Sequence, residues 1–258
     1  KVHFSKYHGT GNDFIMIDGR NTDMATLTNS MIARMCDRHL GIGADGMIVL
    51  SPSDIADFKM DFFNSDGYPG SMCGNGGRCL TSFANEIGVI NQVCSFEAPD
   101  GMHSASILVD RTVKLKLNDV SEIQQMPDGL FLDTGSPHFI VFRLHIDEID
   151  VVEEGRKIRN EARFPDGCNV NFVELTEKGI KVRTYERGVE NETLSCGTGV
   201  SAAAIASYHA GLKKELKIDV KTQGGDLQVE FSKPDGGKVN GLYLSGPAVK
   251  VFEGSWSV

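Results

Sequence analysis

The sequence predicts an α+β fold made of two similar halves, each with short, mostly antiparallel strands around one apolar helix. Three observations support this prediction. The phrase Cys-Gly-x-Gly occurs at Cys73 and again at Cys196, and each copy opens a helical pattern that ends at a glycine, Gly88 or Gly211. Other short motifs recur in the same order in both halves. The remaining segments are short and alternate between apolar and polar residues, as strands do.

The spacing of these motifs indicates an internal duplication. Asn12 lies 61 positions before Cys73, and Ser136 lies 60 positions before Cys196. An apolar strand pattern begins at Gly46, 34 positions after Asn12, and another begins 35 positions after Ser136. Landmarks in one order at nearly equal separations indicate two homologous halves. The predicted division is 1–118, together with a last strand in 248–258, and 119–247.

Each half is predicted to run as strand, helix, strand, strand, cysteine-led helix and further strands. Helical spacing of apolar residues predicts the helices, and alternation between Gly, Asp and Pro turns predicts the strands. In the first half the helices are 28–39 and 73–88, and the strands are 14–18, 47–50, 59–64, 104–109 and 113–117. In the second half the helices are 151–161 and 196–211, and the strands are 130–133, 139–142, 171–175, 179–185, 217–222, 227–231 and 241–245.

Composition and charge exclude several classes of function. The formal net charge of −9 disfavours a nucleic-acid partner, which needs a basic surface. No apolar run is long enough to cross a bilayer, and no signal-peptide pattern opens the chain. Six cysteines in a chain of this size, without a Cys-x-x-Cys pair, indicate reduced thiols in the cytoplasm and no metal site.

A glycine-rich segment, Gly41–Gly46, matches the dinucleotide-binding pattern Gly-x-Gly-x-x-Gly. That pattern requires a strand before it and a helix after it. Here the predicted order is reversed, so we do not expect nucleotide binding.

The paired cysteines predict proton chemistry. A thiol at a helix N-terminus lies in a positive field that favours the thiolate. The backbone N–H groups of Gly74, Asn75, Gly197 and Thr198 could hold one carboxylate. Inversion of an amino-acid α-carbon without a cofactor needs a base on one face, an acid on the other and dipoles that hold the developing charge. Cys73 and Cys196 fit the two proton-carrying roles.

Other polar residues near the cysteines are weaker candidates. Glu186 and Arg187 end a predicted strand shortly before Cys196, and Asn64 ends the matching strand before Cys73. His138 follows a proline at a turn. A Glu-Arg pair is more often a solvated surface pair, and a lone histidine is more often structural. These residues are candidates only because of their positions beside the cysteines.

Taken together, the motifs resemble those of the diaminopimelate epimerase family, of the cofactor-independent amino-acid racemase superfamily. The resemblance covers essentially the whole chain. The segments that carry it are His8–Phe14, Gly41–Gly46, Phe63–Gly67, Met72–Cys79, Pro137–His138, Asn169–Phe172, Tyr185–Gly188 and Cys196–Gly199.

The resemblance implies interconversion of LL- and meso-diaminopimelate, for lysine and cell-wall synthesis, in a cleft between two domains of a homodimeric enzyme without a cofactor. Cys73 and Cys196 would be the acid and base, tuned by His138 and Glu186. The expected substrate-binding residues are Asn12, Asn64, Gly74, Asn75, Ser136, Asn169, Glu186, Arg187, Gly197 and Thr198. The chain departs from the family pattern at Ser136, where many members have Asn, and at Gly46, where some have Gln.

Three alternatives stay open at this point. Ser136 favours a related racemase acting on another amino acid. Cys196 with His138 and Glu186 could form a cysteine hydrolase, which would leave the duplication unexplained. A non-catalytic amino-acid binder would have no need of two activated thiols.

Overall fold

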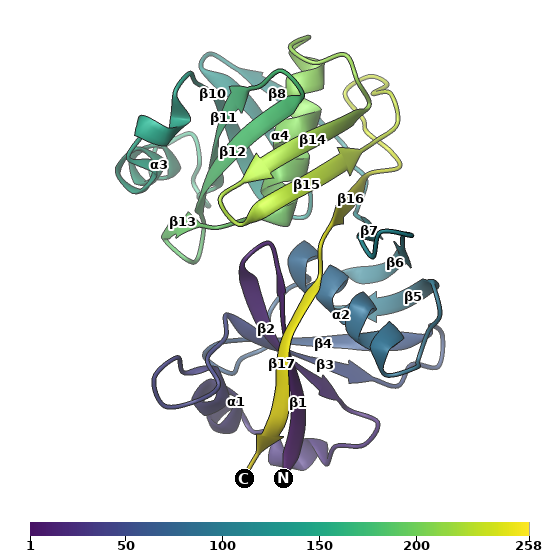
Figure 1. The fold of residues 1–258 in the computed structure, drawn as a ribbon. Coiled ribbons are helices and arrows are strands. Elements are labelled where there is room, and N and C mark those ends of the chain that lie inside the picture. Colours follow the sequence, from purple (N-terminus) through teal and green to yellow (C-terminus); the bar gives the residue numbers. More distant parts are fainter. Residues whose placement is uncertain (258) are drawn as a thin grey trace. The chain divides into compact units, whose positions relative to one another are not determined.

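The computed structural model describes residues 1–257 and divides into two compact units. The first unit contains Lys1–Leu115 and Gly246–Val258, and the second contains Lys116–Ser245. In Figure 1 the two chain ends lie beside each other, because the first and last strands pair along their length. The described residues form four α-helices and many short strands, so the predicted α+β class is confirmed.

The first unit is a mixed sheet that begins with the two ends of the chain. Its strands lie in the order β17, β1, β2, β3, β4, β5, β6 and β7. The pairs β2–β3 and β4–β5 are parallel, and the others are antiparallel. The bounds are β1 Val2–Gly9, β2 Asn12–Asp18, β3 Gly46–Ser51, β4 Phe58–Asn64, β5 Val93–Ala98, β6 Gly101–Ile107, β7 Val113–Lys116 and β17 Val249–Trp256.

The second unit repeats this order and these directions. Its strands run β8, β9, β10, β11, β12, β14, β15 and β16, with β10–β11 and β12–β14 parallel. A short β13 also pairs with β12. The bounds are β8 Ile123–Met126, β9 Gly129–Asp133, β10 Pro137–Phe142, β11 Asn169–Leu175, β12 Gly179–Glu186, β13 Asn191–Thr193, β14 Lys217–Thr222, β15 Gly225–Glu230 and β16 Tyr243–Gly246. The repeated pairing pattern is the structural counterpart of the sequence repeat.

Each unit has one helix that begins at a cysteine and is largely buried. Helix α2, Gly74–Glu86, starts after Cys73, and α4, Gly197–His209, starts after Cys196. Both end before a glycine with positive φ, Gly88 at 72° and Gly211 at 71°, as helix C-termini commonly do. In Figure 1, α4 lies behind β14 and β15. From Gly199 to Ser207 every residue of α4 is buried, because strands surround it.

Each unit has one further α-helix, which packs on the outside of its sheet. Helix α1, Asn29–Cys36, is capped by Thr28, and α3, Val151–Arg159, is capped by Asp150. The apolar faces of these helices pack on separate cores, around Met47 and Val49 in the first unit and around Val170 and Phe172 in the second. One-turn helices are also present at Met24–Thr26 and Ile146–Glu148.

The predicted helices all form, whereas four strands of the structure were not predicted from the sequence. These strands are β1, β5, β8 and β13. Strands β8 and β13 are only 4 and 3 residues long, and none of their residues is buried. Strand β1 is buried on both faces along part of its length, so its polar and apolar residues do not alternate cleanly.

Candidate active site

Both cysteines are the cap residues of their helices, with nearly the same backbone conformation. Cys73 has φ −118° and ψ 123°, and Cys196 has φ −114° and ψ 112°. The N–H groups of the first helical residues project past the helix end toward the cap, so each helix start presents donors beside a sulfur atom. The sequence prediction of two cysteine-led helix N-termini is therefore confirmed in each unit separately.

In the first unit, Cys73 lies beside a series of side-chain amides with fixed orientation. Its Sγ contacts Asn12 Oδ1 at 3.5 Å. Asn75 Nδ2 donates to the same oxygen at 3.3 Å, and Asn75 Oδ1 accepts from Arg78 Nη2 at 3.0 Å. Asn12 Nδ2 donates to Asp45 Oδ2 at 2.7 Å. Since a guanidinium only donates and a carboxylate only accepts, both amides are locked with the Asn12 oxygen facing the sulfur.

Arg78 and Asp45, which anchor this series, had no role assigned from the sequence. Arg78 is completely buried in α2, and burial lowers the pKa of its guanidinium. A Cβ at Gly9 would lie 3.1 Å from Arg78 Nη2, so the missing side chain makes room for the guanidinium. Asp45 belongs to the Gly41–Gly46 segment and is also bound by Arg38 at 2.6 Å. That glycine-rich segment leads into β3 and supports Asn12.

Asp13, next to Asn12, is fixed by two cations. Lys6 Nζ lies 2.7 Å from Asp13 Oδ2, and Arg38 Nη2 lies 2.8 Å from Oδ1. Burial alone would raise the pKa of Asp13, but hydrogen bonds from Arg38 and Lys6 hold it well below its usual range. Asn64 stands apart from this network, with an exposed side chain at the end of β4 opposite Gly46.

In the second unit, Cys196 lies at the end of a chain of polar side chains. Its Sγ is 3.5 Å from Thr198 Oγ1, which is 2.9 Å from His138 Nε2. The other ring nitrogen, Nδ1, lies 3.0 Å from Asn171 Nδ2. His138 is fully buried, and burial, aided by the positive charge of Arg187, lowers the pKa of its imidazolium to about 3. The ring is therefore neutral at physiological pH.

Asn169 braces Ser136 and Arg187, two other predicted substrate contacts. Its Nδ2 donates to Ser136 Oγ at 2.9 Å and to Pro137 O at 3.0 Å, while its Oδ1 accepts from the Arg187 backbone N–H at 2.8 Å. Both amide hydrogens are thus used inside the protein, which leaves only oxygen lone-pair capacity for a ligand. Glu186 Oε2 accepts from Thr193 Oγ1 at 2.7 Å.

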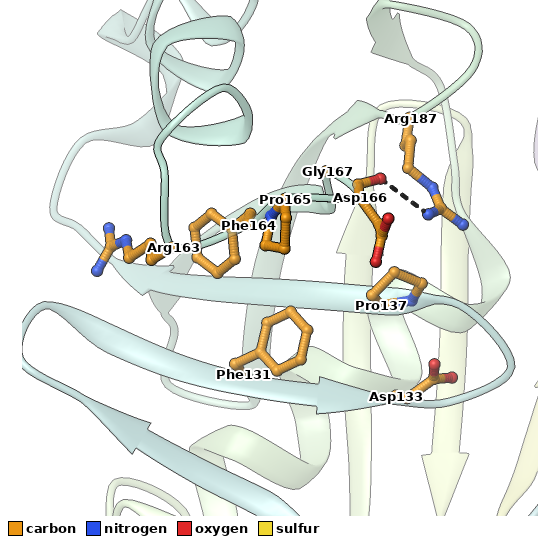
Figure 2. Close-up of a pocket in the computed structure, with 9 residues that line it drawn as sticks. All are labelled: Phe131, Asp133, Pro137, Arg163, Phe164, Pro165, Asp166, Gly167 and Arg187. Atoms are coloured by element: carbon orange, nitrogen blue, oxygen red, sulfur yellow. Dashed lines mark hydrogen bonds between the residues drawn. The ribbon is translucent and has the colours of Figure 1, made fainter.

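A pocket of about 310 Å³ opens beside Arg187 (Figure 2). Arg187 and Asp166 meet at one end, where Arg187 Nη1 donates to the Asp166 carbonyl at 3.3 Å, and Phe131 and Phe164 form an apolar middle section. Asp133 and Pro137 lie below, and Arg163 lines the pocket beside Phe164, so the pocket combines two cations, carboxylates and aromatic rings. Such a lining suits one end of a zwitterionic ligand.

The other four cysteines have no comparable setting. Burial raises the pKa of each thiol, to about 12 for Cys36, Cys79 and Cys168 and to about 11 for Cys94. Among residues 1–257 there is no group of three or more side chains suited to hold a metal ion. No described helix is both long and apolar enough to span a membrane.

Comparison with known proteins gives a family assignment. The family model for diaminopimelate epimerase matches residues 4–121 and 130–251. The chain belongs to the diaminopimelate epimerase family. Curated diaminopimelate epimerases from Flavobacterium psychrophilum and Chlorobaculum tepidum are 45% and 43% identical to it, and the alignments cover 96% of this chain and 97% and 98% of theirs. The family predicted from the sequence motifs is thus confirmed.

Solved structures of more distant proteins share the fold of this epimerase-family chain. A phenazine biosynthesis protein of the PhzF family from Bacillus anthracis matches all of this chain and 99% of its own, with a TM-score of 0.78 at 15% identity. A probable proline racemase from Agrobacterium radiobacter matches with a TM-score of 0.71 at 17% identity, over all of this chain and 93% of its own. At these identities the likeness concerns the two-domain α+β fold.

Proposed function

We propose that this protein interconverts LL- and meso-diaminopimelate, a step that serves lysine and peptidoglycan synthesis: one of Cys73 and Cys196 removes the α-proton, and the other delivers a different proton to the opposite face. The observation that carries the proposal is the matched pair of cysteines capping buried helices in a chain of this family. One thiolate takes the α-proton as the C–H bond breaks. The other cysteine's thiol delivers a proton to the opposite face, so the two sulfurs have exchanged protonation states after one turnover.

The residues around the cysteines support the remaining roles. The N–H groups of Gly74, Asn75, Gly197 and Thr198 would hold the reacting carboxylate and stabilise the charge that develops beside it, without a cofactor. Asn12, Asn64, Ser136, Asn169 and Arg187 would bind the remaining polar groups, and Glu186 the reacting ammonium. These roles require the substrate to lie between the two helix starts, in a cleft between the 1–118 and 119–247 halves.

The pair of cysteines gives the direct test. Cys73→Ala and Cys196→Ala should each abolish inversion, measured as conversion of LL-diaminopimelate by chiral chromatography, while both variants stay folded. Cys94→Ala is the matched control, since its thiol is buried with a raised pKa. Full activity in either active-site variant would contradict the proposal.

A racemase for another amino acid is the second candidate, and Ser136 is the observation that favours it. Its hydroxyl already accepts a hydrogen bond from Asn169, so it offers a ligand one short donor in place of the longer amide found in many family members. Assaying a panel of amino acids decides between the two. Inversion of another amino acid with diaminopimelate inert would select the second candidate.

The cysteine-hydrolase alternative has less support. In a hydrolase of that kind the His138 ring would contact the Cys196 sulfur and Glu186 would hold its other nitrogen, but here Nε2 lies on Thr198 and Nδ1 faces the Asn171 amide. Glu186 accepts a hydrogen bond from Thr193.

A cytoplasmic homodimer is also part of the proposal. Strand β17 is at the end of the first unit's strand order and exposes Val249, Val251 and Phe252 by 43%, 55% and 45%. A long strand with exposed apolar residues at a sheet edge is suited to pair with a second copy of the chain. Light scattering should give twice the chain mass, and Val251→Lys should give monomers. A monomeric wild type would contradict the homodimer.

A further inference from the structure

The chain of polar side chains behind Cys196 includes two residues, Asn171 and Thr184, that have been given no role so far. It starts at Thr184 on β12, passes through Asn171 on β11 and His138 on β10, and reaches Thr198 at the start of α4. Parallel pairing of β10 with β11 sets Asn171 opposite Ile140, and antiparallel pairing of β11 with β12 sets it opposite Thr184. Asn171 is fully buried, so its hydrogen bonds are made inside the protein.

The orientation of the Asn171 amide follows from its neighbours. Its Nδ2 lies 3.4 Å from the carbonyl oxygen of Phe139, which can only accept. Turning the amide over would set two oxygen atoms against each other. Its Oδ1 therefore faces Thr184, whose Oγ1 donates to it at 2.9 Å. The remaining amide hydrogen is directed at His138 Nδ1.

This orientation fixes the tautomer of His138. Because Nδ1 accepts from Asn171, the single proton of the neutral ring must be on Nε2. Nε2–H then donates to Thr198 Oγ1 at 2.9 Å. With its oxygen accepting from the ring, the Thr198 hydroxyl has its own hydrogen left to donate, and Cys196 Sγ is 3.5 Å away. A hydrogen bond donated to sulfur stabilises the thiolate over the thiol.

The start of α4 packs closely against Asn171 and His138. A Cβ at Gly199 would lie 2.4 Å from Asn171 Oδ1 and 3.2 Å from His138 Cε1. A residue with a side chain could not occupy this position without moving the amide or the ring. Gly199, the second glycine of the Cys196 phrase, thus allows the helix to approach Asn171 and His138 closely.

We propose that Asn171 is a positioning residue for Cys196: it holds His138 as the neutral Nε2–H tautomer, so that Thr198 donates its hydroxyl hydrogen to the Cys196 sulfur and favours the thiolate. The proposal rests on the proposed function for its catalytic meaning, but it concerns the resting protein and can be measured without substrate. Asn171 itself does not touch the sulfur. It acts through the ring and the hydroxyl.

Charged groups near Cys196 also contribute to the electrostatic potential of the site, and variants in the chain of polar side chains do not remove this contribution. Arg187 and Glu186 lie at the end of β12, and the positive charge of Arg187 acts on the His138 ring. The N-terminus of α4 adds a positive field of its own. A change at Asn171 or Thr198 should therefore shift the titration of Cys196 without abolishing it.

The test is the pH dependence of iodoacetamide alkylation at Cys196, read by mass spectrometry of its peptide, with Cys73 in the same molecule as internal reference. The thiolate is the reactive species. Thr198→Val, which removes the hydroxyl and keeps the shape, should raise the midpoint of Cys196 alkylation by about one pH unit and slow it about tenfold at pH 7. Asn171→Ala should shift it in the same direction, and the Cys73 midpoint should stay within experimental error.

The His138 tautomer is measured independently by side-chain ¹⁵N NMR. We expect the proton on Nε2 in the wild type and averaged ring nitrogens in Asn171→Ala. Ser207→Ala is the matched control, because Ser207 is a buried residue of α4 that donates to Ala203 O, away from Cys196. If Asn171→Ala does not fold, Thr184→Val, which releases the Asn171 oxygen, should give a smaller shift in the same direction.

Two results would overturn the proposal. One is a wild-type ring with its proton on Nδ1. The other is a folded Asn171→Ala or Thr184→Val protein whose Cys196 midpoint equals that of the wild type. Failure of the proposed function would look different: Cys196 would titrate as described, yet no amino acid would exchange its α-proton.

Discussion

At the scale of single residues, the two sulfur atoms face different partners. Cys73 Sγ lies against an amide oxygen, Asn12 Oδ1, whereas Cys196 Sγ lies against a hydroxyl, Thr198 Oγ1. Each contacting group is held by a further side chain, Asn12 by Asp45 and Thr198 by His138, and His138 is held in turn by Asn171. No role was predicted from the sequence for Asp45 or Asn171. The chemistry of each thiol therefore depends on side chains that do not touch it.

Asp45→Asn tests the support behind Cys73. The carboxylate accepts a hydrogen bond from the Asn12 amide, and an amide in its place replaces a charged acceptor with a neutral one, so Asn12 is held less firmly. Since a hydrogen bond to a charged group contributes about 1.5–3 kcal/mol, we expect kcat/KM for diaminopimelate to fall about 10- to 100-fold. Asp61→Asn is the control, because Asp61 pairs with Lys59 on β4 and does not contact Asn12. Unchanged kcat/KM in Asp45→Asn would show that Asn12 is held by other means.

The buried neutral His138 predicts a pH dependence of stability. The unfolded imidazole binds a proton below its ordinary pKa of about 6.5, whereas the folded ring does so only near pH 3. Between these values the unfolded state holds more protons, so stability falls as pH falls through this window. At pH 5 the loss attributable to His138 is about 2 kcal/mol relative to pH 8.

Urea unfolding at pH 8 and pH 5 measures this effect. His138→Gln removes the titration, so its free energy of unfolding should drop about 2 kcal/mol less than that of the wild type over the same interval. Equal drops in the two proteins would mean that His138 is protonated in the folded state near its ordinary pKa.

At the scale of elements, the two cysteine-led helices have the same ends but different surroundings. The third residue after each cysteine is glycine, Gly76 in α2 and Gly199 in α4. A Cβ at Gly76 would meet the ends of two flexible side chains, Ile48 Cδ1 at 2.8 Å and Met60 Cε at 3.2 Å. At Gly199 it would meet the Asn171 amide and the His138 ring, which are held by hydrogen bonds.

Matched alanine substitutions test this difference. Gly76→Ala should change the free energy of unfolding little, because the gain in helix propensity of about 1 kcal/mol offsets a small repacking cost. Gly199→Ala should lower it by about 1–3 kcal/mol, as overpacking does, and should also slow alkylation of Cys196. Thermal melts of both variants check the prediction. Equal melting temperatures would contradict the distinction drawn between the two helix starts.

The sequence predicted these helices because a cysteine, two glycines and a terminal glycine mark their limits in both halves. It predicted the family from motifs spread over the chain. It did not predict the roles of Arg78, Asp45 or Asn171. A buried arginine in a helix has no periodic signal, and the segment around Asp45 resembled a nucleotide-binding pattern. The role of Asn171 depends on register between β10, β11 and β12, which the pattern along one strand does not reveal.

At the scale of the whole molecule, the duplicated strand order gives each unit one parallel pair ahead of its cysteine-led helix. Strands β2 and β3 in the first unit correspond to β10 and β11 in the second. Asn12 begins β2, and His138 is the second residue of β10. The two halves therefore use different polar residues on the same backbone plan. Asn12 contacts Cys73 directly, whereas His138, two positions after Ser136 (the counterpart of Asn12), reaches Cys196 through Thr198.

The central claim is that two different sulfur groups serve the two faces of one α-carbon, and the most direct test is a first-turnover experiment in deuterium oxide. LL-diaminopimelate is incubated with the enzyme, and product and residual substrate are separated early and analysed by mass spectrometry. We expect one deuterium at the inverted carbon of the meso product and none in the residual LL substrate, because the proton removed and the proton delivered belong to different cysteines. Product that retains the original hydrogen, or residual substrate that gains deuterium as fast as product forms, would contradict it.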